Sequence, residues 1–224
     1  MSKHLLEKRR RTLIVCEGMV DRLYLLTVIK RHTAIAKRPL YPLRNVSANG
    51  RDNVLRTVHN QLKTSEDPYA SVYVVLDTEN RDDIQQIEKR FENIIRQAGS
   101  RAPKDYRIFW SHPSIERWFL LHFEGSNAAF SQAQAAIQKL RQHYPDYSKD
   151  TKSIGRFLSF LYPAPCFEAC LRCALERAQR LEAAAQAIGD PPPTQIHRLI
   201  QAIFPAVQPV AGEDCRKVCR DRRC

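Results

Sequence analysis

The 224-residue chain carries 36 lysines and arginines against 24 aspartates and glutamates, which gives a formal net charge of +12. This length can bury a core without disulfide or metal staples, and the positive excess favours an anionic partner such as nucleic acid. No segment approaches the roughly 20 apolar residues of a membrane-spanning helix, and residues 1–11 lack a signal-peptide core. We therefore expect a soluble, cytoplasmic protein without a membrane partner.

Acidic residues follow two short apolar runs. The first run, residues 12–16, is followed directly by Glu17. The second run, residues 71–76, is followed by Asp77, and Glu79 lies two positions later. Each run precedes a helical pattern, so we predict two parallel strands whose carboxyl ends form one ligand-binding edge. A carboxylate at such an edge needs a positive partner, and Mg²⁺ or Mn²⁺ would supply it.

A mainly apolar segment at residues 20–29 predicts a helix buried beside the sheet. No acid occurs between residues 30 and 44, so this basic stretch is either a solvated loop or an edge that contacts phosphates. The candidate nucleic-acid-binding residues are Lys30, Arg31, Lys37, Arg38 and Arg44 from this stretch, and Arg51 further along.

Residues 40–46 predict a second strand, residues 82–97 a helix and residues 106–110 a fourth strand. A turn at residues 49–52 starts another helix. The apolar stripes of these two helices are Val54, Leu55, Val58 and Leu62, and Ile84, Ile87, Phe91, Ile94 and Ile95. Strands that alternate with helices indicate a mostly parallel four-stranded sheet with flanking helices, which is an α/β fold.

From His112 onward only helices are predicted. They run from Pro113 through His122, over residues 132–143, over residues 166–188, and from a Thr194 cap to Phe204. We expect a basic N-terminal arm (1–10), an α/β domain (11–124), a C-terminal helical region (125–204) and a flexible tail with three cysteines (205–224).

The pattern Glu17-Gly18-x-x-Asp21 after one strand, with Asp77-x-Glu79 after another, resembles the Toprim domain. Topoisomerases, bacterial primases, small-RNA maturases and nucleases of phage-defence systems share that domain. Its usual pattern is a Glu-Gly pair after the first strand and an Asp-x-Asp pair after the third. Glu79 replaces the second Asp here, and its longer side chain displaces the carboxylate.

Residues 111–123 are similar to the Asn-Pro-x-Phe-Glu-x-Trp-x-x-x-His-Phe signature of RloB-type proteins, a Toprim-containing family often encoded near defence genes. Residues 174–178 and 192–199 also resemble that family, so the resemblance spans roughly residues 11 to 203. His112 stands where the family has Asn, Ile115 where it has Phe, and Arg22 where it tends to have an acid.

The resemblance implies that Glu17, Asp77 and Glu79 hold one or two divalent ions, with Asp82 or Asp83 in reach of the metal site. Glu17 could also act as general base or acid. The alternatives are ordinary helix N-terminal roles for Glu17 and turn or capping roles for Asp77 and Glu79.

Glu116 is either a further catalytic residue or a first-turn acid of its helix. It lies six residues before His122, so the two cannot share one ion on a straight helix. We expect His122 to be a hydrogen-bonded core histidine and Trp118 to pack in the core or at an interface, with base stacking as the alternative for Trp118.

Seven cysteines in a chain without an export signal are interpreted first as thiols. The alternative is a zinc site formed by Cys170, Cys173, Cys215 and Cys219.

The leading hypothesis is a metal-dependent endonuclease of bacterial phage defence that cleaves RNA or DNA. The alternatives are an inactive Toprim scaffold that binds nucleic acid or partners an ATPase, and an RNA-processing endonuclease. No phosphate-binding Gly-x-x-x-x-Gly-Lys-Ser/Thr loop occurs, so ATP hydrolysis would belong to a separate ATPase subunit, as the resemblance implies.

Overall fold

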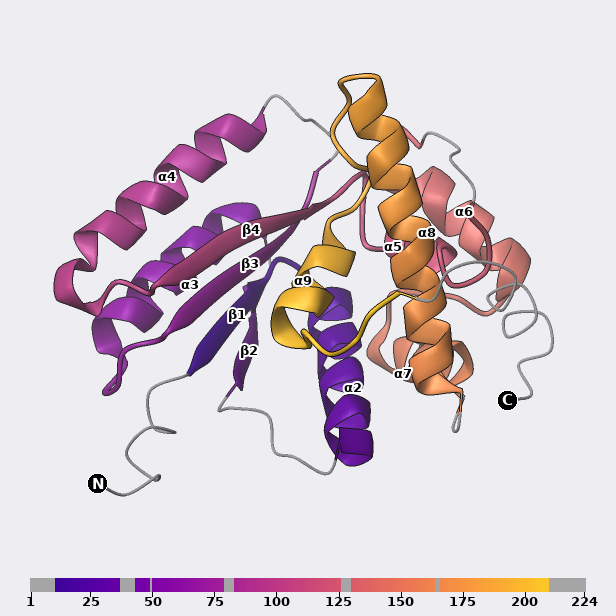
Figure 1. Cartoon of the computed structure of the whole chain (residues 1–224), viewed down its shortest axis with the longest axis horizontal. Coiled ribbons are helices and arrows are strands. Elements are labelled where there is room, and N and C mark those ends of the chain that lie inside the picture. The colour runs from indigo at the N-terminus through magenta and orange to yellow at the C-terminus, as the bar shows by residue number, and fades with distance from the viewer. Residues whose placement is uncertain are drawn as a thin grey trace. The chain divides into compact units, whose positions relative to one another are not determined.

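A four-stranded parallel sheet with strand order β2-β1-β3-β4 organises the N-terminal half of the chain (Figure 1). The strands are β1 (Thr12–Cys16), β2 (Leu43–Ser47), β3 (Ser71–Asp77) and β4 (Asp105–Ser111). The computed structural model describes residues 11–36, 43–48, 50–78, 83–125, 130–163 and 166–209. The predicted α/β fold with a helical C-terminal part is confirmed.

The sheet is built around β1, which pairs in parallel with β2 on one side and β3 on the other. In register, Thr12 pairs with both Leu43 and Ser71, and Cys16 pairs with both Ser47 and Val75. The side chains of residues 13–16 and 72–76 are buried, as expected for strands covered on both faces.

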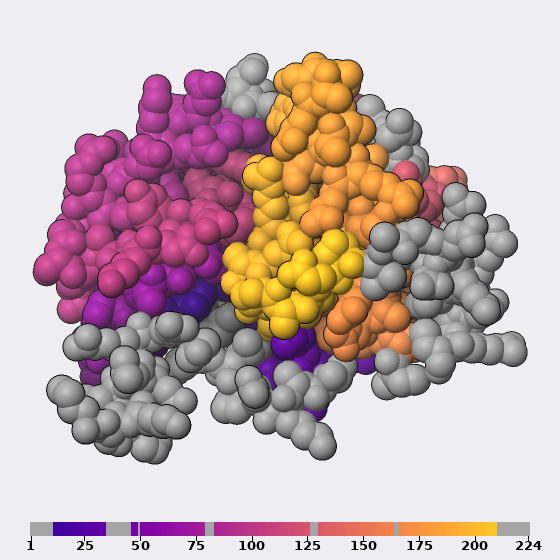
Figure 2. Space-filling view, in the orientation of Figure 1, coloured from indigo at the N-terminus to yellow at the C-terminus, as the bar shows by residue number. Residues whose placement is uncertain are grey.

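Three helices connect these strands: α2 (Met19–Ala36), α3 (Arg51–Thr64) and α4 (Ile84–Gln97), which is followed by the short helix η2 (Gly99–Arg101). Right-handed crossovers in this strand order place α2 on one face of the sheet and α3 and α4 on the other. In agreement, α2 contacts β1 and β2, whereas α3 and α4 pack against each other (Figure 1). Figure 2 shows α4, in magenta, at the molecular surface.

The apolar stripe predicted for α3 is confirmed: Val54, Leu55, Val58 and Leu62 are its buried residues. The stripe of α4 is narrower than predicted, because Ile87, Phe91 and Ile95 are buried while Ile84 and Ile94 stay partly exposed.

One predicted boundary was wrong. α2 continues to Ala36, so Lys30 and Arg31 are helical and do not belong to a loop. No Gly or Pro interrupts residues 19–36, and the first helix-terminating signal is Pro39. The predicted strand over residues 40–46 corresponds to β2, Leu43–Ser47, and its first three residues lie outside the described residues.

The chain divides into two compact units, each described by itself. Unit 1 comprises residues 1–76 and 80–108, and unit 2 comprises residues 77–79 and 109–224. The helices of unit 2 are α5 (Glu116–Leu120), α6 (Ala133–His143), α7 (Thr151–Leu161), α8 (Phe167–Ala187) and α9 (Ile196–Ile203). The expected helices over 132–143 and 166–188 and after Thr194 correspond to α6, α8 and α9.

The helix predicted from Pro113 through His122 is wrong in length, since α5 covers only Glu116–Leu120. After Leu120 the backbone tightens: Leu121 N–H donates to the Trp118 carbonyl and His122 N–H to the Phe119 carbonyl, both at 3.1 Å.

The prediction lacked α7, although its signals are in the sequence. Asp150 caps the helix by accepting a hydrogen bond of 2.9 Å from Ser153 N–H. Its buried apolar residues are spaced at helical intervals: Ile154, Phe157, Leu158 and Leu161.

Aromatic rings form much of the core of unit 2. Phe157 packs against Phe119 and Tyr147, with ring centroids 5.2 and 4.9 Å apart. A second chain of edge-on contacts runs from Trp118 to His122 and from His122 to Tyr162. The tilted and edge-on geometries are the favourable ones for aromatic pairs.

A buried histidine joins α8 to α9. His197 is 1% exposed, and its Nε2 lies 3.0 Å from a carboxylate oxygen of Glu182, which also pairs with Arg198. Burial lowers the pKa of His197 from its ordinary value of 6.5, and the Glu182 carboxylate only partly opposes this.

We expect the free energy of unfolding to fall as the pH is lowered from about 7.5 to about 5.5. A lowered folded-state pKa means that unfolded His197 binds its proton first, so its contribution is complete above pH 6.5 and is lost below it. In urea unfolding experiments across this pH range, the free energy of unfolding of His197→Gln should depend less steeply on pH than that of the wild type. The control His59→Gln removes a partly exposed histidine of unit 1, and an equal flattening there would contradict the assignment.

Candidate functional site

Glu17 lies directly beyond the end of β1 in unit 1. Its backbone N–H donates to the Val75 carbonyl at 2.9 Å, which continues the β1–β3 ladder by one residue. Its own carbonyl accepts a hydrogen bond of 3.4 Å from Gly50 N–H, at the start of α3. The side chain is partly exposed. Glu17 therefore stands at the carboxyl edge of the central strand, as predicted.

The Glu-Gly-x-x-Asp pattern has a steric explanation. Asp21 lies in the first turn of α2, where the helix dipole favours a carboxylate, and it is 2% exposed. A Cβ atom on Gly18 would lie 2.6 Å from Oδ2 of Asp21. A side chain at position 18 would therefore force this carboxylate to shift. Asp21 was missed as a candidate site residue, although an acid in an otherwise apolar helix is a signal that could have found it.

The predicted nucleic-acid-binding residues have different surroundings. The Arg51 guanidinium is ion-paired with Asp83 at 3.1 Å, so its charge is partly compensated. On α2, Lys30 is exposed and Arg31 partly exposed. Lys37 and Arg38 lie outside the described residues, as does the side chain of Arg44.

Unit 2 brings Asp77 and Thr78 together with the end of β4. Asp77 is the last residue of β3 and is partly exposed, while Thr78 N–H donates to the Ser111 carbonyl at 2.9 Å. His112 Nδ1 lies 2.6 Å from the Thr78 carbonyl oxygen. A carbonyl only accepts, so Nδ1 carries the proton and neutral His112 keeps its lone pair on Nε2. In this tautomer Nε2 can accept a hydrogen bond.

His112 was missed as a candidate site residue. The signal in the sequence was its departure from the Asn of the resembled signature. Two of the predicted acids, Glu79 and Asp82, lie outside the described residues.

Glu116 is held inside unit 2 by three donors. Its side chain is 0% exposed; Oε2 accepts a hydrogen bond of 2.5 Å from the Ser114 hydroxyl, and Oε1 one of 2.7 Å from Tyr147. Lys149 Nζ also lies 3.2 Å from Oε1. This carboxylate ties the start of α5 to the segment before α7, which favours the structural alternative for Glu116.

The other signature residues lie in the core, as predicted. Trp118 is fully buried. His122 is buried too, with Nε2 2.6 Å from the Tyr162 hydroxyl and Nδ1 3.3 Å from the Trp118 carbonyl.

The cysteines differ from the expectation in one respect. Cys166 is disulfide-bonded, so the interpretation of all seven cysteines as thiols was wrong. Cys16, Cys170 and Cys173 are buried thiols. Cys215 and Cys219, the other two ligands of the alternative zinc site, lie outside the described residues.

Within the described ranges, no group of three or more His, Cys, Asp or Glu side chains could hold a metal ion. None of the helices in those same ranges is long and apolar enough to cross a membrane.

The sequence profile of the family described as RloB-like protein matches residues 12–203. The chain belongs to the RloB-like family. Comparison with curated proteins and with solved structures gave no match. The profile match of this RloB-like protein begins at β1 and ends with α9, so it includes Glu17, Asp77 and the helices of unit 2.

Replacing Gly18 with Ala should displace the Asp21 carboxylate, because the new methyl group would lie 2.6 Å from Oδ2. We expect a loss of about 1–3 kcal/mol in the free energy of unfolding, as for other overpacked buried sites. Chemical denaturation would measure it. Gly155→Ala on α7 is the control, because nothing lies within 4 Å of a Cβ there. Equal stability of Gly18→Ala and the wild type would contradict the steric role.

Replacing Glu116 with Gln should cost about 1–3 kcal/mol of stability, since the amide NH2 group would face a buried donor and could not accept its hydrogen bond. Thermal and urea unfolding would measure the loss. The exposed Glu88→Gln on α4 should change stability by less than about 0.5 kcal/mol. A fully stable but catalytically inactive Glu116→Gln variant would instead assign Glu116 to catalysis.

Proposed function

We propose that this RloB-like protein is a divalent-metal-dependent endonuclease of the Toprim type, acting on RNA or DNA in bacterial phage defence. The observation that carries the proposal is the register of β1 and β3: Cys16 pairs with Val75, one residue before Glu17 and two before Asp77. Two neighbouring parallel strands thus both end in carboxylates, at the edge where α/β sheets bind ligands. Family membership and the +12 net charge support the same proposal.

The donor set fits a hard cation. Glu17 and Asp77 are partly exposed carboxylates, which is the ligand type that Mg²⁺ and Mn²⁺ take together with water. Glu17, Asp77, Glu79 and Asp82 would hold the ion. When bound, it would polarise the scissile phosphate and make a water molecule more acidic.

The chain's own residues would bind and orient the substrate. The Glu17 carboxylate could take a proton from the attacking water. His112, whose Nδ1–H is held by the Thr78 carbonyl, would present Nε2 as a hydrogen-bond acceptor or proton carrier. Lys30, Arg31, Lys37, Arg38, Arg44 and Arg51 would contact backbone phosphates, and a separate ATPase subunit could be a partner.

The purified protein should cleave plasmid DNA, single strands or total RNA when Mn²⁺ or Mg²⁺ is present. Glu17→Gln and Asp77→Asn should each lower the cleavage rate by about 100-fold or more, because each removes a charged ligand or proton acceptor. Gel assays with and without EDTA would measure this. The matched control is Glu92→Gln, an exposed acid of α4 that should leave the rate unchanged.

Cleavage that survives both substitutions would contradict the proposal. Binding that depends on salt, ignores the metal and gives no product would identify an inactive nucleic-acid-binding scaffold instead. A growth defect of a deletion strain in the absence of phage would favour an RNA-processing endonuclease over defence.

A further inference from the structure

A pocket of about 310 Å³ opens between α3 and α4 within unit 1. Its lining includes His59, Leu62 and Lys63 from α3, Ile94 and Gln97 from α4, and Arg101 from η2. The pocket lies where both helices end. In a parallel sheet with connecting helices, that is the edge opposite the carboxyl ends of the strands. The pocket is therefore separate from Glu17 and from the proposed nuclease chemistry.

Among the described residues, no acid neutralises the positive charges of this pocket. None of its described lining residues is acidic, and no described carboxylate forms an ion pair with Lys63 or Arg101. Four other arginines of unit 1 differ from Arg101 because each forms an ion pair with an aspartate: Arg11, Arg51, Arg90 and Arg107.

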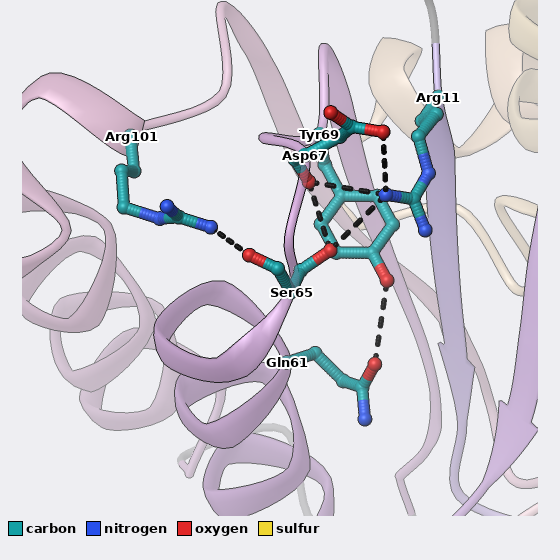
Figure 3. Close-up of polar contacts among 6 residues, drawn as sticks. All are labelled: Arg11, Gln61, Ser65, Asp67, Tyr69 and Arg101. Carbon is teal, nitrogen blue, oxygen red and sulfur yellow. Dashed lines mark hydrogen bonds and ion pairs between the residues drawn. The ribbon is translucent and has the colours of Figure 1, made fainter.

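Two backbone carbonyls at the end of α3 accept hydrogen bonds from Arg101. Its Nε donates to the Leu62 carbonyl at 3.2 Å, and an Nη donates to the Ser65 carbonyl. On the other side of the same turn, Arg11 Nη1 donates to the Ser65 hydroxyl and to the Asp67 carbonyl, both at 3.2 Å (Figure 3). Arg101 thereby neutralises the carbonyl end of α3, which would otherwise repel an anion, and leaves the Lys63 ammonium available to a ligand.

The other residues that line the pocket could contact a flat organic group next to an anion bound at Lys63 and Arg101. Leu62 and Ile94 give the pocket an apolar wall, and the Gln97 amide offers both a donor and an acceptor. The volume falls at the lower end of the range for small-molecule sites. A phosphate near Lys63 and Arg101, with a base near Leu62 and Ile94, would use every one of these features.

We propose that the pocket between α3 and α4 binds a nucleotide, with its phosphate at Lys63 and Arg101. The nucleotide is either a free mononucleotide or one unit of a single strand, since the recognised groups are the same. The site would add a second phosphate contact to the protein, independent of metal ions.

The test is titration of the full-length protein with inorganic phosphate, AMP and a single strand of about 10 nucleotides, all in EDTA. Calorimetry or fluorescence anisotropy would give the dissociation constants. Lys63→Glu should weaken binding about tenfold or more, because it replaces an attraction to phosphate with a repulsion. The matched control is Lys89→Glu, the same charge change on the exposed face of α4 outside the pocket, with an expected change below about twofold.

NMR signals of the His59 imidazole provide a second readout that needs no substitution, and they should shift on addition of AMP or the strand. Tight binding of AMP that Lys63→Glu weakens would identify a free nucleotide as ligand. Binding of the strand alone, weakened in the same way, would identify a strand unit. Equal losses in both lysine variants, or unchanged His59 signals at saturating ligand, would overturn the proposal. Because EDTA is present throughout, loss of nuclease activity cannot be mistaken for failure of this site.

Discussion

The backbone ladder between β1 and β3 is the constraint on which the proposed chemistry depends. It runs from Thr12 opposite Ser71 to Cys16 opposite Val75 and continues through the hydrogen bond from Glu17 N–H to the Val75 carbonyl. A slip of one residue would turn the side chains of a strand to the other face. The buried, apolar strand interiors prevent such a slip and so keep Glu17 one residue beyond the end of the ladder.

The residues of the RloB-type signature, 111–123, mainly serve the packing of unit 2. Glu116 is satisfied by Ser114, Tyr147 and Lys149, Trp118 is fully buried, and His122 is bonded to Tyr162. Buried polar groups with complete partners favour one arrangement of a core, because any other arrangement leaves them unpaired. The family match extends over residues 12–203 and so covers these packing residues as well as Glu17 and Asp77, on which the proposed chemistry depends.

The net charge of +12 also needs the structure for its interpretation. Ion pairs with aspartates already engage Arg11, Arg51, Arg90 and Arg107 in unit 1. Arg101 donates a hydrogen bond to the Leu62 carbonyl near the end of α3. It also lines a pocket in which none of the described lining residues is acidic. Composition alone predicted an anionic partner. The ion pairs indicate which lysine and arginine side chains of unit 1 are already paired with an acid.

Periodicity alone determined most of the elements. The bounds of β1 and the buried face of α3 were predicted residue by residue, because apolar spacing reports directly on burial against a sheet. Periodicity predicted α5 less well, because the backbone hydrogen bonds tighten after Leu120 and end the helix early. Helix α7 was not predicted, despite its Asp150 cap. The positions of Glu17 after β1 and of Asp77 at the end of β3 were likewise predicted from the apolar runs that precede them.

Only the tertiary structure decided how the polar residues are used. Sequence spacing could not show that Tyr147 and Lys149 reach Glu116 across about 30 residues, that the Thr78 carbonyl fixes the His112 tautomer, or that Asp21 lies against Gly18. It also could not reveal the pocket that α3 and α4 form together. Local sequence encodes which residues are buried, whereas hydrogen-bond partners and cavities arise when segments distant in the chain are brought side by side.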